Sequence, residues 1–168
     1  MKQIGWSILF IVLVLGCTSS KPSVSLSENK RQINFMLDYW HDAASNANFE
    51  SYFSKMTPNT IFIGTDATEH WNLEEFKRFS KPYFDKGKAW SFKSLERNVY
   101  LEDDNKTGWF DELLDTQMGV CRGSGVVRLT KDGWKIEHYV LSIAIPNENV
   151  NEVVSLKKIF DTEFVSKY

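Results

Sequence analysis

The feature that most restricts the fold is a change of hydrophobic pattern near residue 90. Before it, apolar residues recur at helical spacing; after it, they fall into four consecutive strand-like runs. These runs predict strands at residues 90–101, 107–115, 119–130 and 134–143. Because their connections are short and polar, the strands are expected to form an antiparallel meander. Helices followed by such a sheet indicate the α+β class, with the helices covering one face.

The longest predicted helix covers residues 30–47. Its apolar side chains are three or four positions apart and form one stripe: Ile33, Leu37, Trp40, Ala44 and Ala47. Before it, Ser25 and Glu28 have the spacing of a capping box. We therefore expect an amphipathic helix with Trp40 on its buried side.

A short helix and a strand are predicted next. Asn48 is expected to cap a helix that Pro58 ends. A strand is expected at residues 60–63, followed by a loop over residues 64–71.

Two further helices complete the predicted elements. Asn72 and Glu75 form a capping pair before a helix that Pro82 is expected to kink or end and Gly87 to close. Residues 148–168 are expected to form a final amphipathic helix.

One hairpin register follows from Asp132-Gly133. This dipeptide favours a two-residue turn, because both central positions of such a turn need positive φ. The turn places Arg128 opposite Glu137, so that opposite charges meet. A three-residue turn, with Arg128 opposite Ile136, is the weaker choice.

A second hairpin register follows from a turn over residues 116–118, which places Glu112 opposite Arg122. Both faces of the resulting sheet are largely apolar, so alternation alone does not decide which face lines a pocket. We expect helices to cover one face and a partner subunit, in a homodimer, to cover the other.

Residues 1–16 have the layout of a secretory signal peptide. Lys2 provides a positive start, and residues 8–15 form an unbroken apolar run. A run this short cannot span a bilayer, which requires about 20 residues.

The segment V-L-G-C at residues 14–17 resembles a bacterial lipobox. This resemblance implies cleavage before Cys17 and a lipid on that cysteine. Residues 17–29 are then the lipidated cysteine and a flexible Ser/Thr-rich tether, and residues 30–147 the folded domain. The expected location is the bacterial cell envelope, lipid-anchored and either periplasmic or associated with the outer membrane.

The amino-acid composition limits the kinds of molecule that the protein is expected to bind. Twenty basic and 22 acidic residues are interleaved without a basic run, so no nucleic-acid partner is expected. Three histidines and two cysteines, none at ligand spacing, predict no metal site, and no cofactor is expected. Aromatic residues are abundant, with 12 Phe, 6 Tyr and 6 Trp, which suits an aromatic-lined cavity as well as a core.

Five short motifs carry a resemblance to a known family. They are Trp40-His41, I-F-I-G-T-D-A-T-E-H-W at 61–71, W-F-D-E at 109–112, C-R-G-S-G-V-V-R at 121–128 and D-G-W-K-I at 132–136. In this order they resemble the SnoaL-like branch of the NTF2-like superfamily. The resemblance implies a cone: a strongly bent antiparallel sheet wraps around the long first helix, with a pocket between them and frequent dimerisation through the sheet.

The resemblance also selects a pocket face. By analogy with relatives, Tyr139 and Leu141 line the pocket, which selects the face predicted to carry Glu112, Arg122 and Ser124.

One known activity of the superfamily is not expected. In the ketosteroid isomerase-like pattern, a tyrosine on the first helix holds the oxyanion and an aspartate near the first strand removes a proton. The corresponding neighbourhoods here hold Trp40 and Phe62-Ile63, and none of these side chains can take over the acid and base roles.

The predicted ligand-binding residues are the aromatic and polar side chains expected around this pocket: Trp40, Trp71, Trp90, Glu112, Arg122, Ser124 and Tyr139. Glu112 and Arg122 could contact a ligand or only satisfy each other.

Two carboxylates, Asp66 and Glu112, are the candidates for a catalytic base, with His41, His70 or Arg122 assisting. The alternative is structural: Asp66 organises a turn, and His41 is a hydrogen-bonded scaffold residue.

Three functions remain open. The first is a membrane-anchored domain that binds a small, partly apolar ligand without chemistry. The second is a SnoaL-like isomerase, cyclase or hydrolase that uses a pocket carboxylate as general base. The third is a dimerisation module whose pocket is vestigial.

Overall fold

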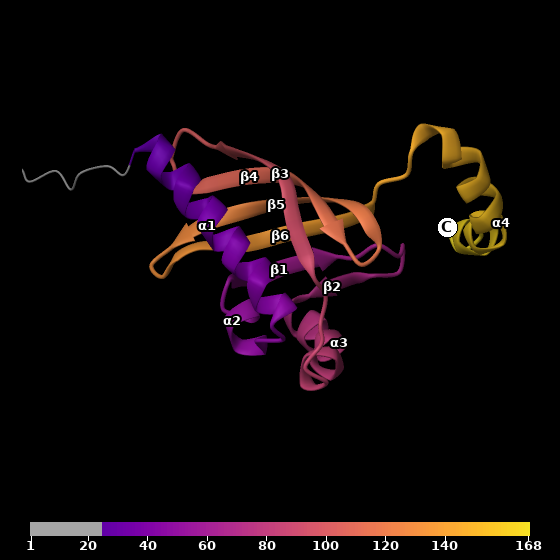
Figure 1. Ribbon diagram of the computed structural model, residues 1–168, viewed down its shortest axis with the longest axis horizontal. Helices are drawn as coiled ribbons and strands as arrows, with labels where there is room; N and C mark the ends of the chain where they lie inside the picture. Colours follow the sequence, from indigo (N-terminus) through magenta and orange to yellow (C-terminus); the bar gives the residue numbers. More distant parts are fainter. Residues whose placement is uncertain (1–24) are drawn as a thin grey trace, which may run out of the picture.

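The computed structural model describes residues 25–168, which form a bent six-stranded sheet and four helices (Figure 1). The elements are α1 (Leu26–Ser45), α2 (Phe49–Phe53), β1 (Met56–Ile63), β2 (His70–Asn72), α3 (Leu73–Asp85), β3 (Phe92–Leu101), β4 (Thr107–Thr116), β5 (Gly119–Thr130), β6 (Gly133–Ile143), the 3-10 turn η1 (Asn147–Asn149) and α4 (Val150–Val165). The strand order is β2-β1-β6-β5-β4-β3, and α1 crosses one face (Figure 1). The predicted α+β cone is confirmed. The predicted signal peptide and Cys17 lie outside the described residues.

Helix α1 begins four residues before its predicted start. The Ser25 hydroxyl accepts a hydrogen bond from the Glu28 backbone N–H at 3.2 Å, and the Glu28 carboxylate accepts two from Arg31 at 2.7 and 2.8 Å. This cap and ion pair stabilise the first turn. Residues 26–29 therefore belong to the helix and not to the predicted tether. Four members of the predicted stripe are confirmed as buried helix residues: Ile33, Leu37, Trp40 and Ala44. The fifth, Ala47, lies beyond the end of the helix at Ser45 with a φ of +52°.

Strand β1 begins four residues before its predicted start at residue 60 and contains Pro58, which was expected to end α2. Helix α2 already ends at Phe53. β1 pairs in parallel with β6, but the ladder is irregular between Met56 and Ile61. Pro58 lies in this interruption, where its missing N–H costs no ladder hydrogen bond. β1 thus joins the antiparallel meander β3–β6 by a parallel pair.

Helix α3 has the predicted capping box, because the backbone N–H groups of Asn72 and Glu75 each donate to the other's side chain, at 2.9 and 3.0 Å. Pro82 does not end the helix, which continues to Asp85. The buried Phe84 lies beyond the proline, and its burial favours this last turn despite one lost hydrogen bond. Gly87 follows the helix with a φ of +70°.

The hairpin between β5 and β6 has a different register from the predicted one. Thr130 pairs with Gly133, so the turn residues are Lys131 and Asp132, and Arg128 pairs with Lys135 rather than with Glu137. The Thr130 hydroxyl donates to the Gly133 carbonyl at 2.8 Å and accepts from the Asp132 N–H at 3.1 Å. Gly133, with a φ of +97°, is the first residue after the turn and not its second central residue. The predicted turn is therefore one residue too late along the chain.

A bulge in β6 then moves the register one residue toward the predicted one without reaching it. The register shifts between Val126 and Val127, which leaves Glu137 without a directly opposite residue. The side chains of Arg128 and Glu137 still form an ion pair. Because of the bulge, Ile136 and Tyr139 are both fully buried although their positions differ by an odd number.

The hairpin between β4 and β5 is one residue out of the predicted register. Thr116 pairs with Gly119, and its hydroxyl accepts from the Met118 N–H at 2.9 Å. Glu112 consequently lies opposite Gly123, whereas Arg122 lies opposite Leu113. A one-residue slip moves every side chain of a strand to the other face. The predicted Glu112–Arg122 pair is therefore wrong.

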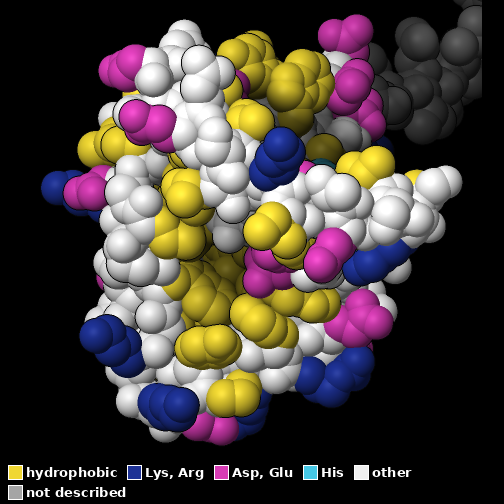
Figure 2. Space-filling model, turned by 90° about the vertical axis from the view of Figure 1, so that its right-hand side faces the viewer, with side chains coloured by type: hydrophobic (Ala, Val, Ile, Leu, Met, Phe, Trp, Pro, Cys, Tyr) yellow, Lys and Arg dark blue, Asp and Glu magenta, His cyan; other side chains and the backbone are white. Residues whose placement is uncertain are grey.

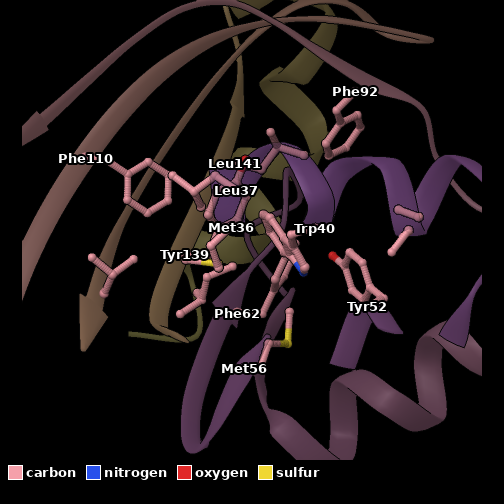
Figure 3. Close-up of a cluster of buried hydrophobic side chains, with 14 of the residues drawn as sticks. Met36, Leu37, Trp40, Tyr52, Met56, Phe62, Phe92, Phe110, Tyr139 and Leu141 are labelled. Carbon is pink, nitrogen blue, oxygen red and sulfur yellow. The ribbon is translucent and has the colours of Figure 1, made fainter. Parts of the chain in front are cut away.

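The inner face of the sheet packs on α1 around Trp40, which lies between Tyr139 and Tyr52 (Figure 3). Two glycines of β5 make room for large side chains. A Cβ at Gly123 would lie 2.3 Å from the Tyr139 hydroxyl, and one at Gly125 would lie 2.9 Å from the Phe110 ring. This bent part of the sheet therefore depends on the missing side chains at both positions.

Helix α4 confirms the last predicted helix, but it extends away from the sheet and buries none of its residues (Figure 1). Leu156 and Ile159 are 85% and 77% exposed. Within residues 25–168, no helix has the length and apolar content needed to cross a membrane.

Candidate functional site

An aromatic pocket opens at the end of the cone, with a volume of about 150 Å³. Figure 2 shows a hollow lined by hydrophobic side chains with acidic groups beside it. The pocket is lined by Phe62, Gly64, Thr65, Glu69, Trp71, Phe76, Phe79, Trp90, Phe92, Gln117, Met118 and Leu141. Two of the predicted ligand-binding residues, Trp71 and Trp90, are among them.

Aromatic stacking fixes the walls of the pocket. Phe62 of β1 stacks on Phe76 of α3 with ring centroids 3.9 Å apart, and Trp71 of β2 stacks on Phe79 at 4.3 Å. Trp90 stacks on Phe76 at 5.8 Å. Because these rings come from separate elements and pack on one another, the pocket presents flat apolar surfaces that hold their orientation.

Besides the hydroxyl-bearing Thr65, the polar side chains of the pocket are Glu69 and Gln117. The Glu69 carboxylate also accepts a hydrogen bond from the Asp66 backbone N–H at 3.2 Å, which holds it beside the loop. The two side chains offer hydrogen-bond acceptors at a site that is otherwise apolar.

Asp66, a predicted catalytic base, lies on the neighbouring loop and does not line the aromatic pocket. It accepts hydrogen bonds from the Thr68 hydroxyl at 2.6 Å and the Thr68 N–H at 2.8 Å, and these two bonds lower the pKa of Asp66. A carboxylate with a lowered pKa is a weaker base. The geometry agrees with the turn-forming alternative. His70 lies nearby in β2 and is exposed.

Glu112, the second predicted base, is 1% exposed and lies at the centre of a buried polar cluster. Its carboxylate is 2.9 Å from His41 Nε2, and it accepts hydrogen bonds from Arg97 Nε at 2.8 Å and the Tyr139 hydroxyl at 3.2 Å. Arg97 also donates to Asp38 at 2.7 Å. We call these five residues the Glu112 cluster.

The electrostatics of the cluster keep Glu112 charged. Burial raises the pKa of Glu112, but the hydrogen bonds and charges of His41 and Arg97 outweigh it, so the pKa lies below its usual value. Burial, and then the charge of Glu112, raises the pKa of Tyr139 far above its usual value. Glu112 is therefore a bound anion whose oxygens are already occupied, which is unfavourable for a general base.

Arg97, and not Arg122, is the cationic partner of Glu112. The two residues are directly opposite in the β3–β4 ladder, and the Arg97 side chain is 5% exposed. Arg122 is exposed on the outer face, opposite Leu113, because of the one-residue register difference. Sequence alternation places Arg97 on the same side of its strand as the apolar Val99 and Leu101, which is the one signal for it in the sequence.

Three other predicted ligand-binding residues lie away from the aromatic pocket. Trp40 and Tyr139 are fully buried in the core. Ser124 lies opposite Asp111 on the outer face of the sheet. The cause is again the one-residue register difference, which puts each β5 side chain on the face opposite to the predicted one. Within residues 25–168, no three His, Cys, Asp or Glu side chains gather as metal ligands.

Solved structures with the same fold carry different names. A protein provisionally named a dehydratase of the NTF2-like family, from Streptomyces avermitilis, is 15% identical, with a TM-score of 0.63 over 73% of this chain and 100% of that one. A protein provisionally named an aromatic ring hydroxylase, from Novosphingobium aromaticivorans, is 14% identical, with a TM-score of 0.60 over 73% and 94%. A provisional calcium/calmodulin-dependent protein kinase II association domain from Xanthomonas campestris is 19% identical, with a TM-score of 0.53 over 70% and 88%.

At these identities the structural likeness establishes the fold and no reaction. No curated protein matches the chain. The family model described as the SnoaL-like domain matches residues 33–146, which is more than half of the sequence. The cone, its pocket and this match together show that the chain belongs to the SnoaL-like domain family.

Proposed function

We propose that the protein binds a small, partly apolar ligand in the aromatic pocket and is held at the bacterial cell envelope by a lipid on Cys17. The observation that carries the binding proposal is the pocket itself, whose apolar walls are stacked aromatic rings and whose polar groups are few. Such a combination is typical of small-molecule sites, because apolar walls supply affinity and isolated polar groups supply orientation.

The size and chemistry of the pocket favour a ligand with one small, flat aromatic group. An apolar cavity of roughly 150 Å³ can hold benzene, and this pocket has about that volume. Glu69 and Gln117 lie in its wall and can accept hydrogen bonds. A phenol or an indole satisfies both conditions, because each combines a flat apolar ring with one donor.

Thermal unfolding in the presence of phenol, indole and acetate tests this proposal. At a concentration about 100 times Kd, a ligand of the native state adds about 2.7 kcal/mol to the free energy of unfolding. Phenol or indole should raise the melting temperature, whereas acetate should not. In Trp71→Leu the effect should weaken, and in the matched variant Trp109→Leu, which changes an exposed tryptophan of the sheet, it should persist. Equal effects in both variants would contradict the proposed pocket.

The membrane part of the proposal rests on the sequence alone, on the apolar run at residues 8–15 and the V-L-G-C segment that ends at Cys17. Cell fractionation of the full chain and of Cys17→Ser tests it. The full chain is expected with the membranes and the variant in the soluble fraction. Membrane association of the variant at the level of the full chain would argue against lipidation.

A second proposed function is homodimerisation through the outer face of the sheet. This face exposes Tyr100, Trp109 and Val120, and the rings of Tyr100 and Trp109 stack at 5.6 Å. An apolar surface of this kind is unusual on a monomer. The name of the Xanthomonas campestris neighbour as an association domain agrees with this use of the fold.

Sedimentation of Trp109→Glu tests the dimer, because a charge at this position must be desolvated in an interface. The unchanged protein is expected to sediment as a dimer and the variant as a monomer. A monomeric unchanged protein would rule out this second function, and the phenol test would remain informative.

A further inference from the structure

The aromatic pocket has an anionic side. In the described part of the chain, Glu69 is the one charged side chain that lines it, and no lysine, arginine or histidine is among the lining residues. Glu69 is half-buried and lies beside the exposed Thr65, in the loop between β1 and β2. The pocket therefore combines an apolar interior with a carboxylate on the side of this loop, where Figure 2 shows acidic groups beside the hollow.

Backbone contacts hold the Glu69 carboxylate in place. One of its oxygens accepts a hydrogen bond from the Asp66 backbone N–H at 3.2 Å, and the Gly64 N–H donates to the Glu69 backbone carbonyl at 3.0 Å. A Cβ at Gly64 would overlap the carboxylate, so the glycine leaves the space that the carboxylate occupies. The acidic group is thus already positioned before a ligand binds, which lowers the cost of binding.

The Glu69 carboxylate has no cationic partner in the described part of the chain. None of the ion pairs formed within residues 25–168 includes Glu69, whereas the buried Glu112 pairs with Arg97. A ligand that fills the pocket removes water from the Glu69 side chain. Because removing water from an unpaired charge is unfavourable, a ligand that supplies the opposite charge has an advantage over a neutral one.

The other polar groups of the pocket do not replace this charge. The Gln117 side-chain carbonyl already accepts from the Ser91 backbone N–H at 3.3 Å, and Thr65 offers a neutral hydroxyl. An ammonium group brings a positive charge and three donors, and its hydrogen bonds to a carboxylate are stronger than neutral ones. The faces of Trp and Phe rings, which form most of the wall, also attract cations.

We infer that the aromatic pocket selects small arylalkylamines: the flat ring packs among Trp71, Phe76 and Trp90, and the ammonium group donates to the Glu69 carboxylate. This inference rests on the proposed binding function of the pocket and names the chemical class of the ligand. Glu69 is the residue that determines this specificity, and no reaction is required of it.

Calorimetric titration at pH 7 with benzylamine and benzyl alcohol tests the inference. The two probes have the same ring and differ only in whether its methylene carries an ammonium or a hydroxyl group. Benzylamine should bind about tenfold more tightly, the difference expected between a charged and a neutral hydrogen bond. Added sodium chloride should reduce this preference, because salt screens a charge that is only half-buried.

Two variants identify the charge responsible. Glu69→Gln removes the charge, while the Gln carbonyl can still accept from the Asp66 N–H and hold the loop. It should weaken benzylamine binding about tenfold and leave benzyl alcohol binding nearly unchanged. Asp66→Asn is the matched control, because it removes a charge from the same loop at a residue that does not line the aromatic pocket. The preference for benzylamine should persist in this control.

Two results would overturn the inference: equal affinity for the two probes in the unchanged protein, or a full preference for benzylamine in folded Glu69→Gln. The first comparison needs no variant, so it decides the matter even if Glu69→Gln does not fold. If benzyl alcohol binds and benzylamine has no advantage, the amine class alone is wrong. If neither probe nor phenol binds, the proposed binding function is wrong as well.

Discussion

Glu112 depends on partners from three other elements: His41 of α1, Arg97 of β3 and Tyr139 of β6. A buried charge is stable only while such partners satisfy it. The cluster therefore ties the long helix to the centre and the edge of the sheet, and the stability of this contact depends on the charge of one residue.

Replacing Glu112 by Gln should destabilise the protein by about 3–5 kcal/mol, because the amide leaves the buried guanidinium of Arg97 without its anion. Asp111→Asn is the matched control: its side chain lies on the other face and accepts one exposed hydrogen bond from Asn98. The control should change stability by less than about 0.5 kcal/mol. Urea unfolding measures both values, and similar losses in the two variants would contradict the special role of Glu112.

The lowered pKa of Glu112 predicts a stability that depends on acid pH. Since this carboxyl holds its proton less tightly in the folded than in the unfolded protein, ionised Glu112 stabilises the fold above the unfolded pKa of 4.5. This contribution is lost as the pH falls through the lower pKa of the folded state. The free energy of unfolding should therefore fall more steeply below pH 4.5 in the unchanged protein than in Glu112→Gln, as measured by urea titrations at several pH values.

The sequence identified the anion of this cluster but not its cation. Glu112 stands out as an acid among apolar residues, whereas Arg122 seemed its partner only because the hairpin register was one residue out. Arg97 shares an alternation pattern with Val99, but choosing it requires the β3–β4 register, which has a bulge between Ser94 and Glu96.

The two hairpins that determine the registers share a four-residue pattern, Thr-x-x-Gly, at residues 116–119 and 130–133. In both, the threonine hydroxyl donates to the glycine carbonyl at 2.8 Å, and the glycine has positive φ. A comparison of the two segments could have placed both turns. The prediction of a turn at Asp132-Gly133 does not take into account the hydrogen bonds of the Thr130 hydroxyl. These bonds favour a turn at Lys131-Asp132.

Gly133→Ala should lose about 1–2 kcal/mol of stability, because an L side chain is strained at positive φ. No atom lies within 4 Å of the position a Cβ would occupy, so the loss reports backbone strain and not a clash. Gly133→Asn is the control and should lose less, since Asn tolerates this conformation better. Thermal unfolding of the two variants measures the difference; a larger loss in the Asn variant would contradict the strain explanation.

At the scale of the whole molecule, the order of helices and strands predicts the α+β class, because each element has a clear periodicity, and the resemblance to the SnoaL-like branch predicts the cone. The aromatic pocket was predictable only in part. Trp71 and Trp90 were among the predicted pocket residues, and both line the pocket. The stacking of Phe62 on Phe76 could not be predicted, because it depends on how α3 packs on β1. Single residues of a core cannot be separated from those of a pocket by composition alone.

Removal of residues 147–168 should leave the stability of the cone within about 0.5 kcal/mol, because no residue of α4 is buried. The family match also ends at residue 146. Urea unfolding of the shortened chain measures the effect. A loss above about 2 kcal/mol would show that α4 contributes to the folded core in solution.

Helix α4 and strand β5 should also differ in hydrogen exchange. β5 is bonded on both sides, to β4 and β6, so its amides can exchange only when the sheet opens. The amides of α4 are held by the helix alone, and an isolated helix of this length is marginal in water. In deuterium oxide, α4 is therefore expected to exchange among the first elements and β5 among the last, and a partner that covers α4 would be detected as slower exchange along its apolar side.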